Sequence, residues 1–331
     1  MKALRAYDYN KEQKMQQLKV SSDGSAQYTT IQSALDAARL DDVVTVYIYN
    51  GVYREKLVCS HPNATLVGES RDAVLLTGAD GGKHFDAQGQ PLGTFRSQTA
   101  LFDGEQICVK NMTIANTAGD GRVHGQSLAA AVYSAYAVFE NVDFVGCQDT
   151  LFTGPLPEKE RLKNGFLGKH QFTPRIKSGQ YYKNCSITGD IDFIFGGADA
   201  LFENCAIHCR DRGEAINGYV TAPSTAKEDI GYVFYNCKID GTAKHTFYLG
   251  RPWRAYGKAA FISCEISDVI MPDGFDDWQD TANRATSTFA EYANKGDGAN
   301  GKRAFGKKLS EAQAQQLLEK IYNRVNVPYA P

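Results

Sequence analysis

Two acidic residues occupy unusual places in the sequence. Asp192 lies inside the apolar run 191–195 (IDFIF), and Asp149 lies in the segment 146–152 (GCQDTLF). A carboxylate in such a run is costly to desolvate unless it is paired or its pKa shifts. Either aspartate alone could be an ordinary turn residue. Their occurrence together with Arg251 of the motif LGRPW favours a catalytic pair of carboxylates instead.

Two carboxylates that lie close together do not ionise equally. The one beside Arg251 stays an anion and can act as a base or nucleophile, whereas the pKa of the other rises until it holds a proton near neutral pH. Gln148, and Gln126 of HGQSLAAAV, are neutral amide donors suited to the oxyanion of an acyl transfer. Trp253 offers a flat apolar face for a sugar ring, although it could also be a surface residue of a structural bend.

The elements that must position these side chains are repeated short strands. Six segments alternate apolar and polar residues with a period of two, which indicates β-strands. They span residues 109–114, 139–144, 182–187, 202–207, 234–239 and 261–266. The residues at one shared position are Asn111, Asn141, Asn184, Asn204, Asn236 and Ser263. Irregular repeats of this length indicate a solenoid, and the Asn-Cys steps in register favour a parallel β-helix over an antiparallel β-sandwich.

Two amphipathic helices are expected near the chain ends, over residues 28–40 and 309–325. The second begins with a capping box formed by Ser310 and Gln313. Because the ends of a solenoid expose an apolar cross-section, we expect these helices to close the two ends. The fold prediction is therefore an all-β parallel β-helix with short terminal helices, formed by one domain over residues 1–331.

The polar segment 153–179 contains three prolines and is expected to loop out of one coil as an insertion. Asp149 and Asp192 then fall on adjacent coils, whose strands stack about 4.8 Å apart. Arg251, from a later coil, is expected to reach one of the two carboxylates. Asp190, which precedes the apolar run, is expected in a solvated turn.

Composition excludes several classes of partner. The 331 residues include 36 basic and 38 acidic side chains, for a formal net charge of −2, so no bulk field attracts nucleic acid or an anionic membrane. The eight cysteines are expected to be buried thiols. Cys205, His208 and Cys209 are not expected to bind a metal, because on a strand His208 points away from the two thiols. The first 20 residues contain no apolar signal-peptide core, which predicts a cytoplasmic protein, with secretion as the alternative if a signal has been removed. The protein is expected to be a monomer.

Several motifs, in this order, resemble the signatures of the pectin methylesterase family. They are GVYREKL at 51–57, GQSLAAAV at 125–132, CQDTLF at 147–152, DFIFGGADALFENC at 192–205 and LGRPW at 249–253. The resemblance covers nearly the whole chain and implies a right-handed parallel β-helix. It also implies hydrolysis of the methyl esters of galacturonate units in pectin or oligogalacturonides, without a metal or organic cofactor.

The resemblance implies a role for each residue of the polar motifs. Asp192 matches the nucleophile that attacks the ester carbonyl, and Asp149 matches the general acid that protonates methanol and then activates water. Gln126 and Gln148 match the oxyanion donors. Arg251 matches the residue that keeps the nucleophile ionised and oriented.

Aromatic positions also match the family. Trp253 corresponds to a sugar-stacking platform, and Phe152 and Phe195 to positions that line the cleft. Two segments depart from the family's pattern: 153–179 extends a loop that is short in the plant enzymes, and 274–278 (GFDDW) replaces the usual Gly-Trp. The longer loop could reshape the groove beside Asp149. The missing signal predicts a cytoplasmic enzyme acting on short oligogalacturonides.

Two other functions remain open from the sequence. A pectin-degrading glycosidase or lyase would use the same solenoid, but an inverting glycosidase needs carboxylates about 6.5–9.5 Å apart, and a lyase needs a calcium site and a basic residue. A non-catalytic carbohydrate-binding β-helix would retain Trp253 without needing Asp149, Asp192 and Arg251 together.

Overall fold

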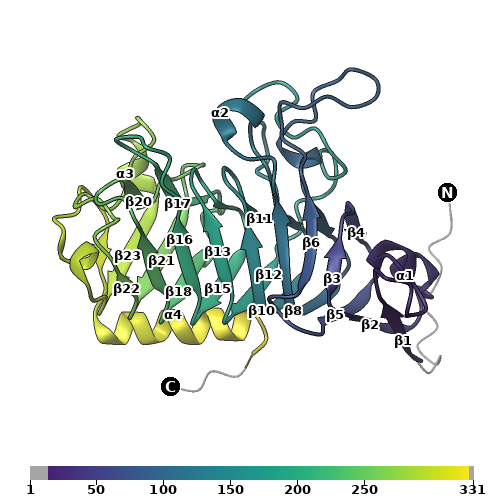
Figure 1. Ribbon diagram of the computed structural model, residues 1–331. Coiled ribbons are helices and arrows are strands. Elements are labelled where there is room, and N and C mark those ends of the chain that lie inside the picture. Colours follow the sequence, from purple (N-terminus) through teal and green to yellow (C-terminus); the bar gives the residue numbers. More distant parts are fainter. Residues whose placement is uncertain (1–13, 328–331) are drawn as a thin grey trace, which may run out of the picture.

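Parallel β-strands are the main regular secondary structure of the computed structural model, which describes residues 14–327 (Figure 1). Consecutive coils of the chain stack their strands into three ladders, which form the faces of a right-handed parallel β-helix. The fold predicted from the repeats is confirmed.

The first ladder contains the first strand of most coils. Its members are β1 (Met15–Val20), β2 (Val43–Ile48), β5 (Asn63–Gly68), the first half of β8 (Gln106–Asn116), the first half of β10 (Tyr136–Val145), β12 (Gly179–Lys183), β15 (Asp199–Glu203), β18 (Tyr232–Tyr235), β21 (Lys258–Ile262), β23 (Thr288–Tyr292) and β24 (Lys307–Lys308).

The second and third ladders complete each coil. The second consists of β3 (Gly51–Tyr53), β6 (Val74–Gly78), the second halves of β8 and β10, β13 (Ser186–Gly189), β16 (Ala206–Cys209), β19 (Lys238–Gly241) and β22 (Glu265–Ile266). The third consists of β4 (Leu57–Cys59), β7 (Ala100–Phe102), β9 (Ala130–Val132), β11 (Leu151–Thr153), β14 (Ile194–Gly196), β17 (Gly218–Pro223) and β20 (Phe247–Gly250).

The repeated asparagines form the bend between the first and second ladders. All five have a positive φ of 53° to 57°, a left-handed conformation that asparagine tolerates better than most residues. The Asn141 amide donates to Asn111 Oδ1 over 2.9 Å, and the Asn236 amide donates to Asn204 Oδ1 over 2.6 Å. The repeat seen in the sequence is therefore a repeated backbone bend, with amide side chains bonded between coils.

The interior is filled by columns of identical or similar side chains. The rings of Phe139, Tyr182, Phe202, Phe234 and Phe261 stack with centroids 4.5 to 5.1 Å apart. A parallel column of thiols follows the asparagine bends, at Cys185, Cys205, Cys237 and Cys264, and all four are buried. Burial of these columns against one another, repeated coil after coil, supplies the main hydrophobic stabilisation.

Within residues 14–327 the α-helices are α1 (Ile31–Ala37), α2 (Gly121–His124), α3 (Asn283–Thr286) and α4 (Glu311–Arg324). Helix α1 begins after Thr30, whose side chain accepts from the Ser33 amide, and its buried residues join the main core at the N-terminal end. Thus α1 closes one end of the solenoid, as predicted. None of the helices in residues 14–327 is long and apolar enough to cross a membrane.

Helix α4 has the predicted capping box of Ser310 and Gln313, but it does not close the C-terminal end. It lies along the outside of the first ladder, where Ile321 and its apolar face pack against Tyr181, Leu201 and neighbours (Figure 1). The reason is that the outward positions of this ladder are themselves apolar. The C-terminal end of the core instead contains rings such as Phe275 and Phe289.

Candidate active site

Asp149 and Asp192 occupy equivalent positions on adjacent coils. Strands β11 and β14 pair with Leu151 opposite Ile194, and each aspartate lies two residues before its strand. The Asp149 amide donates to the Ile191 carbonyl over 3.0 Å, which continues the ladder up to the two aspartates. With coils about 4.8 Å apart, the carboxylates are near neighbours, as the sequence predicted.

Both aspartates end a tight turn between the second and third ladders. Asp149 has a φ of 64° and Asp192 a φ of 51°, so both adopt the left-handed conformation. Short polar residues tolerate this conformation, and its strain is typical of functional positions. In these two coils the turn therefore interrupts an otherwise apolar column and places one carboxylate from each coil at the same edge.

Arg251 binds only one of the two carboxylates. Its Nε donates to Asp192 Oδ1 over 2.8 Å and its Nη2 donates to Asp192 Oδ2 over 2.7 Å. The guanidinium is held between two rings, with its Cζ 3.7 Å from the ring centroid of Tyr219 and 3.7 Å from that of Trp278. This bidentate, ring-clamped geometry fixes the orientation of the Asp192 carboxylate.

The environment separates the acidities of the pair. Burial raises the pKa of Asp149 well above its usual range, and the charge of Asp192 raises it further. Burial also raises the pKa of Asp192, but the charge and hydrogen bonds of Arg251 oppose that rise. Asp149 therefore holds its proton to higher pH than Asp192, which leaves a carboxylic acid beside a carboxylate.

A cavity of about 330 Å³ opens over the two aspartates. The residues on its wall are Thr94, Phe95, Gln126, Gln148, Asp149, Arg161, Leu162, Gly165, Phe166, Asp192, Phe195, Ala222, Arg251, Trp253, Arg254 and Trp278. Seven of the eight site residues singled out in the sequence are among them. The structure thus brings together both aspartates, both glutamines, the arginine and two of the three aromatic residues.

Phe152 is the exception, because its side chain is fully buried and is absent from the cavity wall. Its ring packs behind the wall, with centroids 4.8 Å from Phe95 and 5.0 Å from Phe195. Strands β11 and β14 place Phe152 and Phe195 in register, and the ring of Phe95 lies against both. In this structure Phe152 therefore supports the cleft rather than facing it.

The expectation for Asp190 is wrong. It is only 3% exposed, and its Oδ1 accepts from the Ile191 amide over 2.6 Å. Burial raises its pKa as well. Sequence alone could not distinguish a solvated turn from one covered by neighbouring coils, because the covering residues lie far away in the chain.

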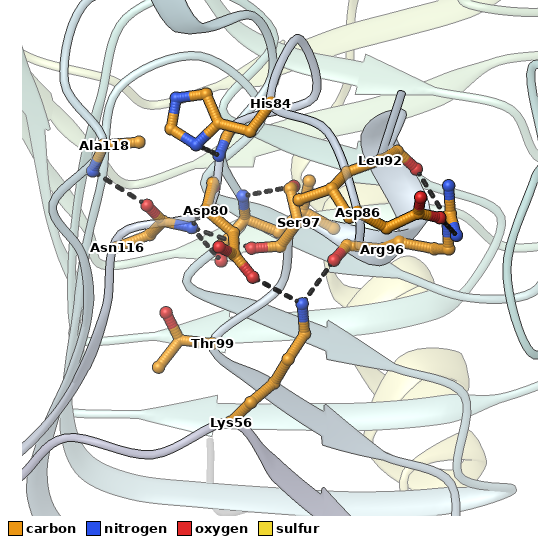
Figure 2. Close-up of polar contacts among 12 residues, drawn as sticks. Lys56, Asp80, His84, Asp86, Leu92, Arg96, Ser97, Thr99, Asn116 and Ala118 are labelled. Carbon is orange, nitrogen blue, oxygen red and sulfur yellow. Dashed lines mark hydrogen bonds and ion pairs between the residues drawn. The ribbon is translucent and has the colours of Figure 1, made fainter. Parts of the chain in front are cut away.

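The loop before β7 supplies Phe95 to the cavity. It is held by a polar network in which Lys56 Nζ lies 2.7 Å from Asp80 Oδ2 and Arg96 Nη1 lies 2.8 Å from Asp86 Oδ2 (Figure 2). The Asn116 amide donates to the Asp80 carbonyl over 2.9 Å. These contacts fix the loop, and with it the position of the Phe95 ring, without contributing to the cavity wall themselves.

Residues 154–178 connect β11 to β12 and form another wall of the cavity. Phe166 is buried there, with its ring centroid 5.9 Å from that of Phe95 and 6.1 Å from that of Trp253. Asp103 anchors the same loop by accepting from His170 Nε2 over 2.8 Å, and it pairs with Lys169 over 2.6 Å. The loop predicted as an insertion thus lies against the site.

Two features of the Asp103 anchor indicate that the contact is stable. Burial alone would raise the pKa of Asp103, but hydrogen bonds from His170, Lys169 and Ser60 outweigh burial and lower the pKa to about 2. The His170 ring also stacks on Tyr133, with centroids 3.9 Å apart. The anchor therefore stays ionised over the whole range in which the protein would be assayed.

Sequence reasoning missed Tyr219 and Trp278. Tyr219 lies on β17, which pairs with β14 in the next coil after Asp192, a relation that strand pairing would have revealed. Trp278 belongs to GFDDW, which was noted only as a departure from the family pattern. Among residues 14–327 no group of three or more His, Cys, Asp or Glu side chains could hold a metal ion.

Comparison with known proteins agrees with this site. The family model for pectinesterases matches residues 17–156 and 171–317. Probable pectinesterase 8 of Arabidopsis thaliana is 34% identical over 317 residues, which cover 90% of this chain and 72% of the relative. Other curated relatives are longer, and this chain spans about half of their length.

Solved structures agree in fold. The pectin methylesterase from carrot superposes with a TM-score of 0.79 at 27% identity, covering 95% of this chain and 97% of that one. A pectin methylesterase in complex with a hexasaccharide superposes with a TM-score of 0.77 at 25% identity, covering 98% and 100%. The same β-helix therefore occurs in solved structures of pectin methylesterases.

The predicted cytoplasmic location is wrong. The curated relatives are plant cell-wall pectinesterases, which are secreted. The prediction rested on the residues at which this sequence begins, and these carry no information about location. The relatives agree with the alternative of a secreted protein.

Three independent comparisons point the same way. The family model matches most of the residues from 17 to 317, a relative is more than 30% identical over nine tenths of the chain, and the structures share the whole fold. The chain belongs to the pectinesterase family.

Proposed function

We propose that this protein is a pectin methylesterase, which hydrolyses the methyl ester of galacturonate units and releases methanol. One observation carries the proposal: two carboxylates stand in register on adjacent coils, and only Asp192 is bound by Arg251. This asymmetry provides a nucleophile and an acid side by side.

In the first half of the reaction, an oxygen of Asp192 attacks the ester carbonyl carbon. The Gln126 and Gln148 amides donate to the oxyanion that develops on the carbonyl oxygen. When the tetrahedral intermediate collapses, the bond to the methoxy oxygen breaks and Asp149 gives its proton to the departing methanol. The galacturonyl group is then joined to Asp192 as an acyl-enzyme anhydride.

In the second half, Asp149 is a carboxylate and takes a proton from water. The water oxygen attacks the acyl carbon, the same amides stabilise the second oxyanion, and the bond to Asp192 breaks. The product is a galacturonic acid, which releases its proton to solvent and becomes the carboxylate, and the site returns with Asp192 ionised and Asp149 protonated. Arg251 favours this end state because it holds the Asp192 carboxylate through two hydrogen bonds.

The cavity wall supports a sugar substrate. Trp253 and Phe195 are both on the wall, with ring centroids 5.6 Å apart, and provide apolar surface for a pyranose ring. The hexasaccharide complex of a related methylesterase supports pectin or an oligogalacturonide as the ligand. We further propose that the protein acts as a monomer and that one domain carries the whole site, including residues 154–178.

The test is methanol release from methyl-esterified oligogalacturonides, with absorbance at 235 nm and reducing ends followed in parallel. The proposal predicts methanol without new absorbance and without new reducing ends. Unsaturated products absorbing at 235 nm would indicate a lyase, and new reducing ends would indicate a glycosidase. No signal in any channel, with saccharide binding retained, would indicate a carbohydrate-binding β-helix.

A further inference from the structure

Two arginines on the cavity wall have no carboxylate partner. Arg161 and Arg254 both line the cavity, beside Asp149 and Asp192. Among the described residues neither forms an ion pair, whereas Arg251, the third arginine of the wall, is bound to Asp192. The cavity therefore carries positive charge that its catalytic chemistry does not use.

Arg254 is held in place by the backbone alone. Its Nη1 donates to the Trp253 carbonyl and its Nη2 to the Lys159 carbonyl, each over 2.8 Å. Its Cζ lies 4.7 Å from the ring centroid of Trp253. Burial and the charge of Arg161 lower the pKa of Arg254 to about 10, so it remains a cation at neutral pH. Two of its five N–H groups are used, which leaves three for a ligand.

Arg161 lies on the wall of the same cavity. Its Cζ is 5.0 Å from the ring centroid of Trp278, whose ring also packs against Arg251. No hydrogen bond or ion pair to Arg161 occurs within residues 14–327. Burial and the charge of Arg251 lower its pKa, and Asp192 and Asp280 oppose this only in part. The guanidinium is thus stacked in place, with its donors unused.

The segment that carries Arg161 lies outside the residues that the family model matches and is fixed in position. The pectinesterase family model omits residues 157–170. Arg175 ties this segment together by donating to the carbonyls of Pro157, His170, Gln171 and Thr173. Together with the Asp103 anchor, these bonds make the segment a fixed wall of the cleft.

We infer that Arg161 and Arg254 form a subsite for a free galacturonate carboxylate next to the ester that is cleaved. The inference rests on the proposed methylesterase function. A methyl ester is neutral and gains little from a guanidinium, whereas a carboxylate accepts charge-assisted hydrogen bonds from the guanidinium fork. The subsite would make this enzyme prefer an ester whose neighbour in the chain has already been demethylated.

The test compares two substrates in one assay of methanol release. One is trigalacturonate methylated on a single unit, and the other is fully methylated trigalacturonate. The ratio of kcat/KM for the first to that for the second is measured for the wild type, Arg161→Gln and Lys163→Gln. Lys163→Gln is the matched control, because it removes a positive charge from the same segment at an exposed residue away from the cavity wall.

Arg161→Gln is expected to lower this ratio by about 10-fold, mainly through KM, which is the size of one charge-assisted contact. Arg161→Lys should restore part of the ratio, and Lys163→Gln should leave it within about 2-fold. An unchanged ratio in Arg161→Gln would overturn the inference. An equal loss on both substrates would also overturn it, because Arg161 would then only support the Trp278–Arg251 stack.

A binding measurement separates this inference from the proposed function. Trp253 and Trp278 are the only tryptophans of the chain and both line the cavity, so tryptophan fluorescence reports ligands there. Unmethylated trigalacturonate should change the fluorescence of the wild type, with a Kd about 10-fold weaker in Arg161→Gln. If no methanol is released but the Kd is weaker in Arg161→Gln, the proposed function is wrong and the carboxylate subsite is upheld. Absent or equal binding overturns the subsite, whether or not methanol is released.

Discussion

Two edges of the β-helix use the same left-handed backbone conformation, but one edge stabilises the fold and the other forms the candidate active site. At the bend between the first and second ladders, five of the residues with positive φ are asparagines, and two pairs of their amides bond between adjacent coils. At the turn before the third ladder, the residues with positive φ on two adjacent coils are Asp149 and Asp192. Spacing and backbone are alike at both edges, and only the side-chain groups differ.

The difference shows how a repeat fold gains a reactive site. Amides stacked one coil apart satisfy each other, because each carries both a donor and an acceptor. Carboxylates stacked in the same way repel, and burial adds a desolvation penalty, so one must be held by a cation and the other must keep its proton. The asparagine edge therefore stabilises the fold. The aspartate edge lowers stability but gives its two carboxyl groups different pKa values.

The largest expected effect on stability comes from removing the cation at the aspartate edge. Arg251→Gln leaves the Asp192 carboxylate buried without its partner, and we expect it to lower the free energy of unfolding at pH 7 by about 3 kcal/mol. The pKa of Asp192 should rise further, because the opposing influence of Arg251 is lost. Chemical denaturation at several pH values measures both effects.

The sign of the pH dependence follows from the raised pKa. Below the unfolded pKa of an aspartate, close to 3.8, Asp192 is protonated in both states and its contribution to the difference between the variant and the wild type should vanish. The difference should grow as pH rises from there to neutrality. A loss of stability that is equal at pH 3 and pH 7 would show that packing between Tyr219 and Trp278, rather than charge, is what Arg251 provides.

The next effect has the opposite sign. Asp149→Asn replaces the carboxyl that Arg251 does not bind with a neutral amide, and we expect it to raise the free energy of unfolding at pH 8 by about 1 kcal/mol while abolishing methanol release. Because burial raises the pKa of Asp149, its wild-type contribution to stability is full below the unfolded pKa and is lost as pH rises through the folded pKa. The gain should therefore be absent at pH 3 and present at pH 8.

A destabilised Asp149→Asn would contradict this account of the aspartate edge. It would mean that the carboxyl group forms a contact that an amide cannot replace. Thermal unfolding of both proteins at pH 3 and pH 8 is sufficient, since the prediction concerns the change between the two conditions.

The smallest effects belong to the asparagine edge. The Asn236 amide donates to Asn204 Oδ1, so Asn236→Asp places a carboxylate against that acceptor and should lower the free energy of unfolding by about 1 kcal/mol. Asn204→Asp keeps an acceptor in the same place and should change stability by less than about 0.5 kcal/mol. Equal effects of the two substitutions would mean that the hydrogen bond from Asn236 to Asn204 does not contribute to stability. Methanol release should stay at the wild-type level in both.

The sequence predicted the parts of this molecule that repeat along the chain. The period-two strands, the asparagine bends and the thiol column recur at matching positions, so their stacking could be inferred without coordinates. The same register brought Asp149 and Asp192 together, because a loop that leaves and returns to one coil does not change the pairing. Residues with a fixed place in the repeat were therefore the predictable ones.

The parts that could not be predicted depend on contacts between non-repeating segments. Helix α4 lies on the side of the first ladder because apolar residues on the outside of β12, β15 and β18 accept it, a surface visible only after the strands are paired. Phe152 is covered and Arg161 reaches the cavity because loops from two distant parts of the chain meet over the site. No periodicity in the sequence predicts these contacts between loops.

The most direct test of the central claim is methanol release by Asp192→Asn beside Asp190→Asn. Both variants neutralise a buried carboxylate in the same turn, and the Asp190 acceptor oxygen is kept by asparagine. We predict that Asp192→Asn loses at least about 10⁴-fold in kcat and that Asp190→Asn stays within about 3-fold of wild type, with both folded. Asp192→Asn that is folded and active, or equal losses in the two variants, would contradict the assignment of Asp192 as the nucleophile.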